Sequence, residues 1–122
     1  MVLVDTSVWI EHLRHGHPLL AELLTETSVA MHPFITGELA CGNLKNRTGL
    51  LADLNALPAA TLASQEEVLR LLEERGLWGR GLGWVDAHLL ASALLSHSAF
   101  WTLDGRLAQA ARDVGLPSYR MT

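Results

Sequence analysis

Apolar segments alternate with amphipathic segments along the chain, in the order typical of proteins that form strands and helices in turn. Short apolar runs predict buried strands at residues 2–4, 28–31 and 99–102, with weaker candidates at residues 59–63 and 118–120. Helical spacing predicts helices over residues 8–14, 19–24, 33–42, 50–55, 66–75, 86–97 and 106–114. This alternation predicts an α/β fold, a three-layer α/β/α sandwich with a short, mostly parallel central sheet.

The composition is that of one globular domain covering residues 1–122. Hydrophobic residues make up 49% of the chain and charged residues 18%, which is unlike a disordered protein. No apolar stretch approaches the roughly 18 residues of a membrane span, so we expect no membrane insertion. The first residues lack the basic and apolar regions of a secretion signal, which predicts a cytoplasmic protein.

Charge, cysteine content and one glycine-rich loop exclude several kinds of binding site. The net charge of −4 argues against capture of nucleic acid by the whole surface, although bound metal and a few arginines could reverse the sign locally. Cys41 is the only cysteine, which excludes an intrachain disulfide and a cysteine-based zinc cluster. We expect it to be a small buried side chain. The glycine-rich loop at residues 76–83 lacks the Gly-Lys-Ser/Thr ending of a nucleotide-binding P-loop.

Four acidic residues, each with apolar neighbours, are the strongest chemical signal: Asp5, Glu38, Asp86 and Asp104. Carboxylates are rarely buried unless something compensates their charge. Asp5 and Asp104 directly follow predicted strands, and the other two lie in early turns of predicted helices. Because ligands gather at the carboxyl ends of parallel strands, all four acids should converge at this rim. The alternative is four separately capped or salt-bridged acids.

Converging carboxylates would repel one another, and a divalent cation would offset that repulsion. Oxygen ligands suit Mg²⁺ and Mn²⁺, and such a site can promote hydrolysis of a phosphodiester. Three hydroxyl side chains beside the acids, Thr6, Ser7 and Thr102, could orient the acids or a bound water. Each could equally be a helix cap or a partner of the backbone.

Four stretches look like the four motifs of PIN-domain ribonucleases, in order along nearly the whole chain. They are residues 4–10 (VDTSVWI), 37–42 (GELACG), 83–92 (GWVDAHLLAS) and 101–107 (WTLDGRL). The resemblance is particularly close to the VapC toxins of type II toxin–antitoxin pairs.

This resemblance implies a PIN-like fold and a Mg²⁺- or Mn²⁺-dependent endoribonuclease. Asp5, Glu38, Asp86 and Asp104 would be both the catalytic acids and the metal ligands, with Asp5 and Asp86 as the principal direct ligands. It also implies a homodimer and a cognate antitoxin protein as partner. Thr102 matches the hydroxyl that often accompanies the last acid.

Other classes fit less well. A haloacid-dehalogenase-like phosphatase would need an aspartate where the chain has Ser7, and a phosphoacceptor receiver domain would need a late lysine, whereas the only lysine is Lys45. A non-catalytic PIN-like binding module with an acidic pocket stays open. Metal-dependent cleavage of RNA would separate this alternative from the enzyme.

Basic and aromatic side chains near the motifs are candidate RNA contacts. The basic candidates for phosphate contacts are Arg14, Lys45, Arg47, Arg80 and Arg106, although each could be an ordinary solvated charge. Among the tryptophans, Trp78 in the glycine-rich loop is expected to be exposed. Core or dimer packing is expected for Trp9, Trp84 and Trp101.

Overall fold

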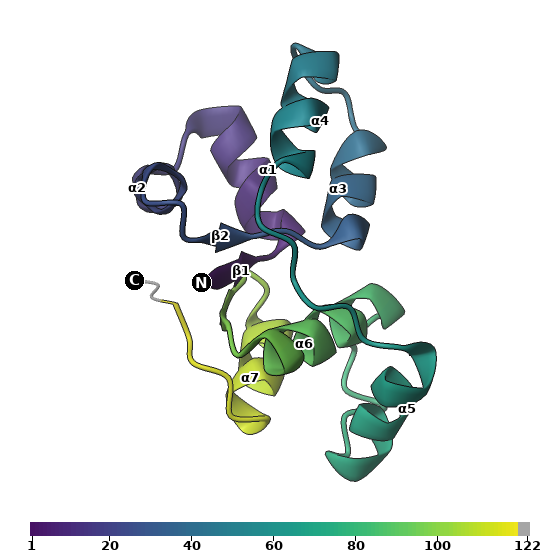
Figure 1. Ribbon diagram of the computed structural model, residues 1–122. Coiled ribbons are helices and arrows are strands. Elements are labelled where there is room, and N and C mark those ends of the chain that lie inside the picture. Colours follow the sequence, from purple (N-terminus) through teal and green to yellow (C-terminus); the bar gives the residue numbers. More distant parts are fainter. Residues whose placement is uncertain (120–122) are drawn as a thin grey trace.

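Three short parallel strands form the centre of the molecule in the computed structural model, which describes residues 1–119 (Figure 1). They are β1 (Val2–Val4), β2 (Val29–Ala30) and β3 (Ala99–Trp101), in the order β2-β1-β3. All three residues of the central strand are buried, as expected of a β-branched run in a covered parallel sheet. The three stronger strand predictions are therefore confirmed.

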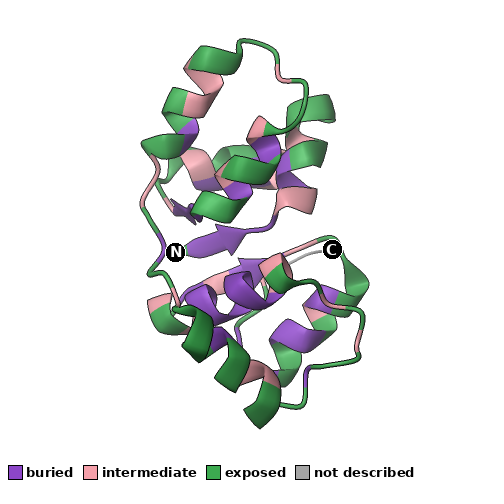
Figure 2. Cartoon of the chain, turned by 90° about the vertical axis from the view of Figure 1, so that its right-hand side faces the viewer, coloured by how far each residue is buried: buried purple, intermediate pink, exposed green. Residues whose placement is uncertain are grey.

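Helices cover both faces of this sheet (Figures 1 and 2). On one face lie α1 (Thr6–His15), α2 (Pro18–Thr25), α3 (Pro33–Ala40) and α4 (Arg47–Asn55). On the other lie α5 (Gln65–Glu74), α6 (Trp84–Ser96) and α7 (Gly105–Asp113). The predicted three-layer sandwich is confirmed, and each predicted helix is present with ends that differ by at most three residues. None of the helices in residues 1–119 is long and apolar enough to cross a membrane.

Local sequence explains where several of these helices begin. Ser64 and Glu67 form a reciprocal capping box at the start of α5: the Ser64 amide donates to the Glu67 carboxylate (2.8 Å), and the Glu67 amide donates to Ser64 Oγ (3.1 Å). Pro33 occupies the first turn of α3, where its missing N–H costs nothing. Helix α6 is apolar nearly all round, and a continuous run of its residues, 87–93, is buried against the rest of the fold.

The weaker strand predictions are not confirmed. Residues 59–63 form no strand; only Ala59 makes an isolated parallel bridge, to Met31. Pro58, which has no N–H to donate, contributes its carbonyl to the amide of Met31 (2.8 Å), and pairing ends after Ala60. Near the C-terminus, Ser118 makes a single bridge to Phe100, and the rest of that predicted edge strand, Arg120, lies outside the described residues.

Candidate active site

Asp5 is the most enclosed of the four acids. It follows β1 directly, is 7% exposed, and its amide donates to the carbonyl of Trp101 in the neighbouring strand (2.8 Å). Its Oδ2 accepts hydrogen bonds from Ser7 Oγ (2.8 Å) and Thr102 Oγ1 (2.7 Å). Two hydroxyl donors compensate the carboxylate in a place where water is nearly excluded.

The same two hydroxyls also accept hydrogen bonds from the backbone that follows β3. The Leu103 amide donates to Ser7 Oγ (3.0 Å), and the Asp104 amide donates to Thr102 Oγ1 (3.0 Å). Because each oxygen accepts from an amide, its own hydrogen is directed at Asp5. Neither hydroxyl caps α1, but Ser7 and Thr102 each have both of the other predicted roles, since they contact the carboxylate of Asp5 and also bind the backbone.

Asp104 follows β3 and begins α7. Its Oδ1 accepts from the amides of Arg106 (2.9 Å) and Leu107 (3.2 Å), a helix N-cap. The side chain is exposed at the rim of the sheet. Its position is set by the Thr102 and Ser7 contacts just before it.

Glu38 reaches the same rim from α3. Its Oε1 accepts a hydrogen bond from Thr6 Oγ1 (2.6 Å), although the two residues are 32 positions apart. The Thr6 hydroxyl therefore connects the first turn of α1 to the helix that carries Glu38. This is the third hydroxyl in the group that bonds an acid and caps no helix.

Asp86 lies in the first turn of α6, where its Oδ2 accepts from the Gly83 amide (2.9 Å). Burial raises the pKa of the Asp86 carboxyl, and the negative charges of Asp5, Asp104 and Glu38 raise it further, against the lowering effect of the Gly83 hydrogen bond. The carboxyl of Asp86 thus interacts electrostatically with all three other acids. Four segments that are distant in sequence contribute to one negatively charged site.

The four carboxylates are not preassembled into a coordination sphere. Within residues 1–119, no three histidine, cysteine, aspartate or glutamate side chains are close enough together to hold one ion. Each acid has a separate hydrogen-bond donor, and mutual repulsion favours this spacing. The donor set is nevertheless made only of oxygen, which fits a hard divalent cation such as Mg²⁺ or Mn²⁺.

His32 is the N-cap of α3, the helix that carries Glu38. Because its side chain is buried, we expect the stability of the fold to depend on pH. Its Nδ1 accepts from the Phe34 amide (2.9 Å), and the side chain is 2% exposed. Burial, together with the nearby His88, lowers the pKa of His32 to about 4 from 6.5. Since the unfolded chain binds this proton more readily, the free energy of unfolding should fall between pH 6.5 and pH 4, by on the order of 2–3 kcal/mol.

Denaturant unfolding of the wild-type protein and of His32→Asn across this pH range measures the effect. Asparagine keeps an acceptor at the N-cap but does not titrate, so this variant should have a flatter pH profile. His97→Asn is the matched control, because His97 is exposed and its left-handed backbone tolerates asparagine. Equal slopes for the wild type and His32→Asn would contradict the prediction.

Two of the predicted RNA contacts are engaged in the fold. Arg47 donates to the carbonyls of Ala40 (2.5 Å) and Gly42 (3.1 Å), which closes the turn after α3. Arg80 pairs with Asp113 of α7 at 2.7 Å. Both guanidinium groups therefore have structural partners, and phosphate contacts by either would compete with these bonds.

Two of the other basic candidates line a pocket with Glu38, and the third follows Asp104 in sequence. Arg14 and Lys45 line a pocket that also includes Glu38. Arg106 packs directly on the backbone of Gly81: a Cβ atom at that glycine would lie 2.6 Å from Arg106 Nη1. Arg106 is also two residues from Asp104, so these three cations remain candidates for phosphate contacts.

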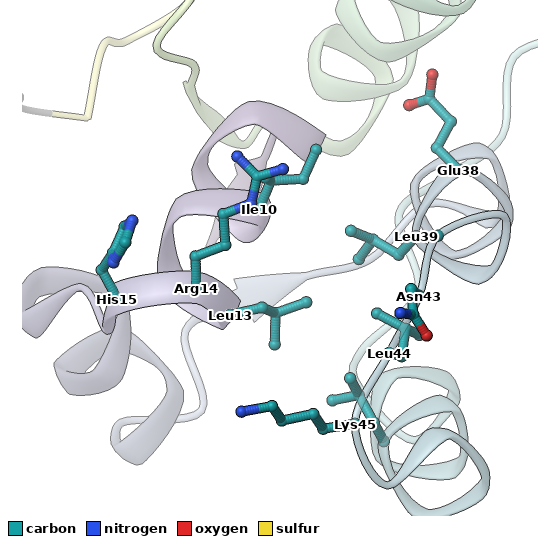
Figure 3. A pocket seen from close by; sticks show the side chains of 11 residues that line it. Ile10, Leu13, Arg14, His15, Glu38, Leu39, Asn43, Leu44 and Lys45 are labelled. Atoms are coloured by element: carbon teal, nitrogen blue, oxygen red, sulfur yellow. The ribbon is translucent and has the colours of Figure 1, made fainter.

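The pocket itself was not predicted. It has a volume of about 530 Å³ and lies between α1, α3 and α4. Figure 3 shows apolar side chains facing one another across it, with Glu38 at one end and Lys45 at the other. The apolar lining is made by Ile10, Leu13, Leu39, Leu44 and Leu50. The only signal in the sequence was that Ile10 and Leu13 extend the apolar face of α1 beyond what the core needs.

The predictions for large or reactive side chains are partly confirmed. Trp9 and Trp101 are buried, and Trp78 is 63% exposed, as expected. Trp84 is 42% exposed, so it is not in the core, and packing against a second copy, the other role predicted for it, stays a prediction. Cys41 is also exposed rather than buried, because it follows the last turn of α3 on the outer side of the molecule.

Comparison with known proteins agrees with the fold. The chain matches the PIN domain family over residues 2–113. It is 49% identical over 120 residues to Ribonuclease VapC32 of Mycobacterium tuberculosis, covering 95% of this chain and 94% of the relative. The chain therefore belongs to the PIN domain family and, within it, to the VapC ribonucleases. The crystal structure of PAE2754 from Pyrobaculum aerophilum has a similar fold, with a TM-score of 0.59 and 20% identity over 88% of this chain and 77% of that one.

Proposed function

We propose that residues 1–122 form a single nuclease domain, a Mg²⁺- or Mn²⁺-dependent endoribonuclease that acts as the toxin of a toxin–antitoxin pair. Its catalytic and metal-binding residues are Asp5, Glu38, Asp86 and Asp104. The observation that carries the proposal is the electrostatic coupling of Asp86 to the other three acids. The 49% identity to a ribonuclease supports RNA as the substrate, and an RNA substrate implies action in the cytoplasm.

The surrounding residues hold these acids in place. Ser7 and Thr102 orient Asp5 with two hydrogen bonds, Thr6 holds Glu38, and the Gly83 amide holds Asp86. When bound, the divalent cation would neutralise charge that develops on the phosphodiester during hydrolysis. Fixed hydroxyl and amide donors keep the carboxylates from swinging outward to solvent, which preserves a negative site for that cation.

The pocket beside Glu38 supports an antitoxin as partner. Its lining is apolar, and Arg14 and Lys45 add positive charge at its edge. A peptide segment with apolar side chains and a carboxylate would match both properties. Bound there, the segment would lie against Glu38 and obstruct the active site, which is how an antitoxin would silence the enzyme.

Exposed apolar residues support a homodimer. Leu69 of α5 and Leu95 of α6 are 47% and 40% exposed and lie on helices of the same layer. Between these helices, a shallow groove also includes Arg70 and Glu74. A surface with both charges and apolar side chains can pair with a second copy of itself.

Incubation of the purified protein with single-stranded RNA tests the proposed function. We expect cleavage with Mn²⁺ or Mg²⁺, none with excess EDTA, and none by Asp5→Asn under any condition. Asp53→Asn, a change at an exposed acid of α4 outside the site, should cleave like the wild type. Binding of RNA without cleavage in any divalent metal would indicate the non-catalytic binding module instead.

A further inference from the structure

A row of three aromatic rings connects α3 to α6 beside the acidic site. The ring centroids of Phe34 and His88 are 5.0 Å apart, and those of Trp84 and His88 are 4.7 Å apart, both in edge-to-face contact. His88 is 8% exposed, whereas Phe34 and Trp84 are 38% and 42% exposed. The buried imidazole thus lies between two large rings that remain open to solvent.

Both outer rings lie on helices that carry proposed catalytic acids. Phe34 is four residues before Glu38 on α3, so the two side chains share one face of that helix. Trp84 is two residues before Asp86 in the first turn of α6, so the ring and the carboxyl leave the same turn in different directions. The rings are therefore attached to the same rigid elements as the acids, and their contacts with His88 restrict how they can turn.

The charge around the site explains why such rings would be useful for a polyanionic substrate. The chain carries a net charge of −4, and four of its acids gather at this rim. Arg47 and Arg80 are held by partners within the fold. Of the basic candidates, Arg14, Lys45 and Arg106 remain for phosphate, so a contact that does not depend on charge would add to the binding of RNA.

We propose that Phe34 and Trp84 form a stacking platform that binds nucleobases of single-stranded RNA and positions the adjoining phosphodiester at the acids. The inference rests on the proposed ribonuclease function and adds two substrate-positioning residues to it. Every base has a flat π face, so exposed aromatic rings bind single strands with little regard to sequence. Adenine, the more extended ring system, should bind the platform better than uracil.

Binding of fluorescein-labelled oligoadenylate to Trp84→Ala, in the non-cleaving Asp5→Asn background, tests the platform. We expect the Kd to rise roughly ten-fold, the loss that corresponds to one stacked base. The slope of log Kd against log salt concentration should stay unchanged, because no phosphate contact is lost. The same change should matter less for oligouridylate. In the cleaving protein, KM should rise while kcat changes little.

Conservative and control variants keep the test independent of folding. Trp84→Phe retains a ring, so it should keep most of the affinity while reducing the quenching of tryptophan fluorescence by oligoadenylate. Phe34→Leu keeps the apolar volume but removes the π face, and it should weaken binding like Trp84→Ala. Leu62→Ala removes an apolar side chain that is 56% exposed and lies outside the aromatic row, and it should bind like the parent.

Three outcomes would overturn the platform. The first is unchanged affinity in Trp84→Ala and Phe34→Leu while the wild type still cleaves RNA, which leaves the ribonuclease function intact. The second is an equal loss in Leu62→Ala. The third is that Trp84→Ala or Phe34→Leu converts a dimer to a monomer without changing the affinity for RNA per chain. The surface would then be a contact between two copies of the protein. If the wild type neither binds nor cleaves RNA, the proposed function itself fails.

Discussion

Asp86→Asn should lower RNA cleavage by at least about 100-fold and, without divalent cations, should raise the melting temperature by a few degrees. The loss of cleavage follows from the loss of a proposed metal ligand. The gain in stability follows from the raised pKa of the Asp86 carboxyl, since its charged form is disfavoured by burial and by three neighbouring acids. Asparagine can still accept the hydrogen bond from the Gly83 amide.

The sign of the stability effect depends on pH in a way that identifies its cause. A carboxyl whose folded pKa is raised destabilises the fold at pH values above that pKa, and it ceases to do so when it is protonated in both states. The advantage of Asp86→Asn should therefore be present at pH 7 and disappear as the pH falls below 3.8, the ordinary value of this group. Thermal unfolding followed by circular dichroism at several pH values measures this difference.

Asp53→Asn is the matched control, because it removes one negative charge at an exposed position on α4. It should leave both cleavage and its pH profile near those of the wild type. A stability gain of equal size in Asp53→Asn would attribute the effect to net charge rather than to the site. Cleavage by Asp86→Asn at the wild-type rate would refute the assignment of Asp86.

The placement of Asp5 and Asp104 at one rim could be predicted because it depends on topology alone. Asp5 and Asp104 each follow a strand, and parallel strands end at the same rim, so their convergence needed no side-chain detail. The strands themselves were visible as β-branched and aromatic runs. Helix α6 was visible as an apolar segment longer than any strand.

Features that depend on packing between distant segments could not be predicted. Residues 59–63 are apolar, but they form a strand only if several of them pair with the segment that contains Met31. In the structure the pairing covers one residue, Ala59. Trp84 lies in an apolar motif, yet its ring is 42% exposed and packs on His88, which also contacts Phe34. Nothing local to Trp84 indicates that arrangement.

The hydrogen bonds that hold the acids could not be predicted either. Thr6, Ser7 and Thr102 were recognised as neighbours of the acids, but hydroxyls beside a helix start usually cap it. The Ser7 hydroxyl accepts from the Leu103 amide 96 positions away, and the Thr6 hydroxyl donates to Glu38 32 positions away. Only the folded chain brings these donors and acceptors together.

Mn²⁺ and Mg²⁺ should stabilise the folded protein strongly, because a cation that binds only the folded state removes the repulsion among the four acids. At a free concentration of about 100 times its Kd, one bound ion adds about 2.7 kcal/mol to the free energy of unfolding. That gain should be smaller at pH 5 than at pH 7, since the raised pKa of Asp86 lets protons compete with the metal. Thermal unfolding during a Mn²⁺ titration measures it.

The double variant Asp5→Asn/Asp86→Asn should show almost none of this stabilisation, whereas Asp53→Asn should show all of it. The contrast separates a specific site from general screening of a protein with a net charge of −4, because screening would act on both variants alike. Potassium at matched ionic strength should not reproduce the effect. An equal shift in the double variant would mean that the cation binds elsewhere. The acids would then hold their positions through Ser7, Thr102 and Thr6 alone, without the metal that the proposed chemistry requires.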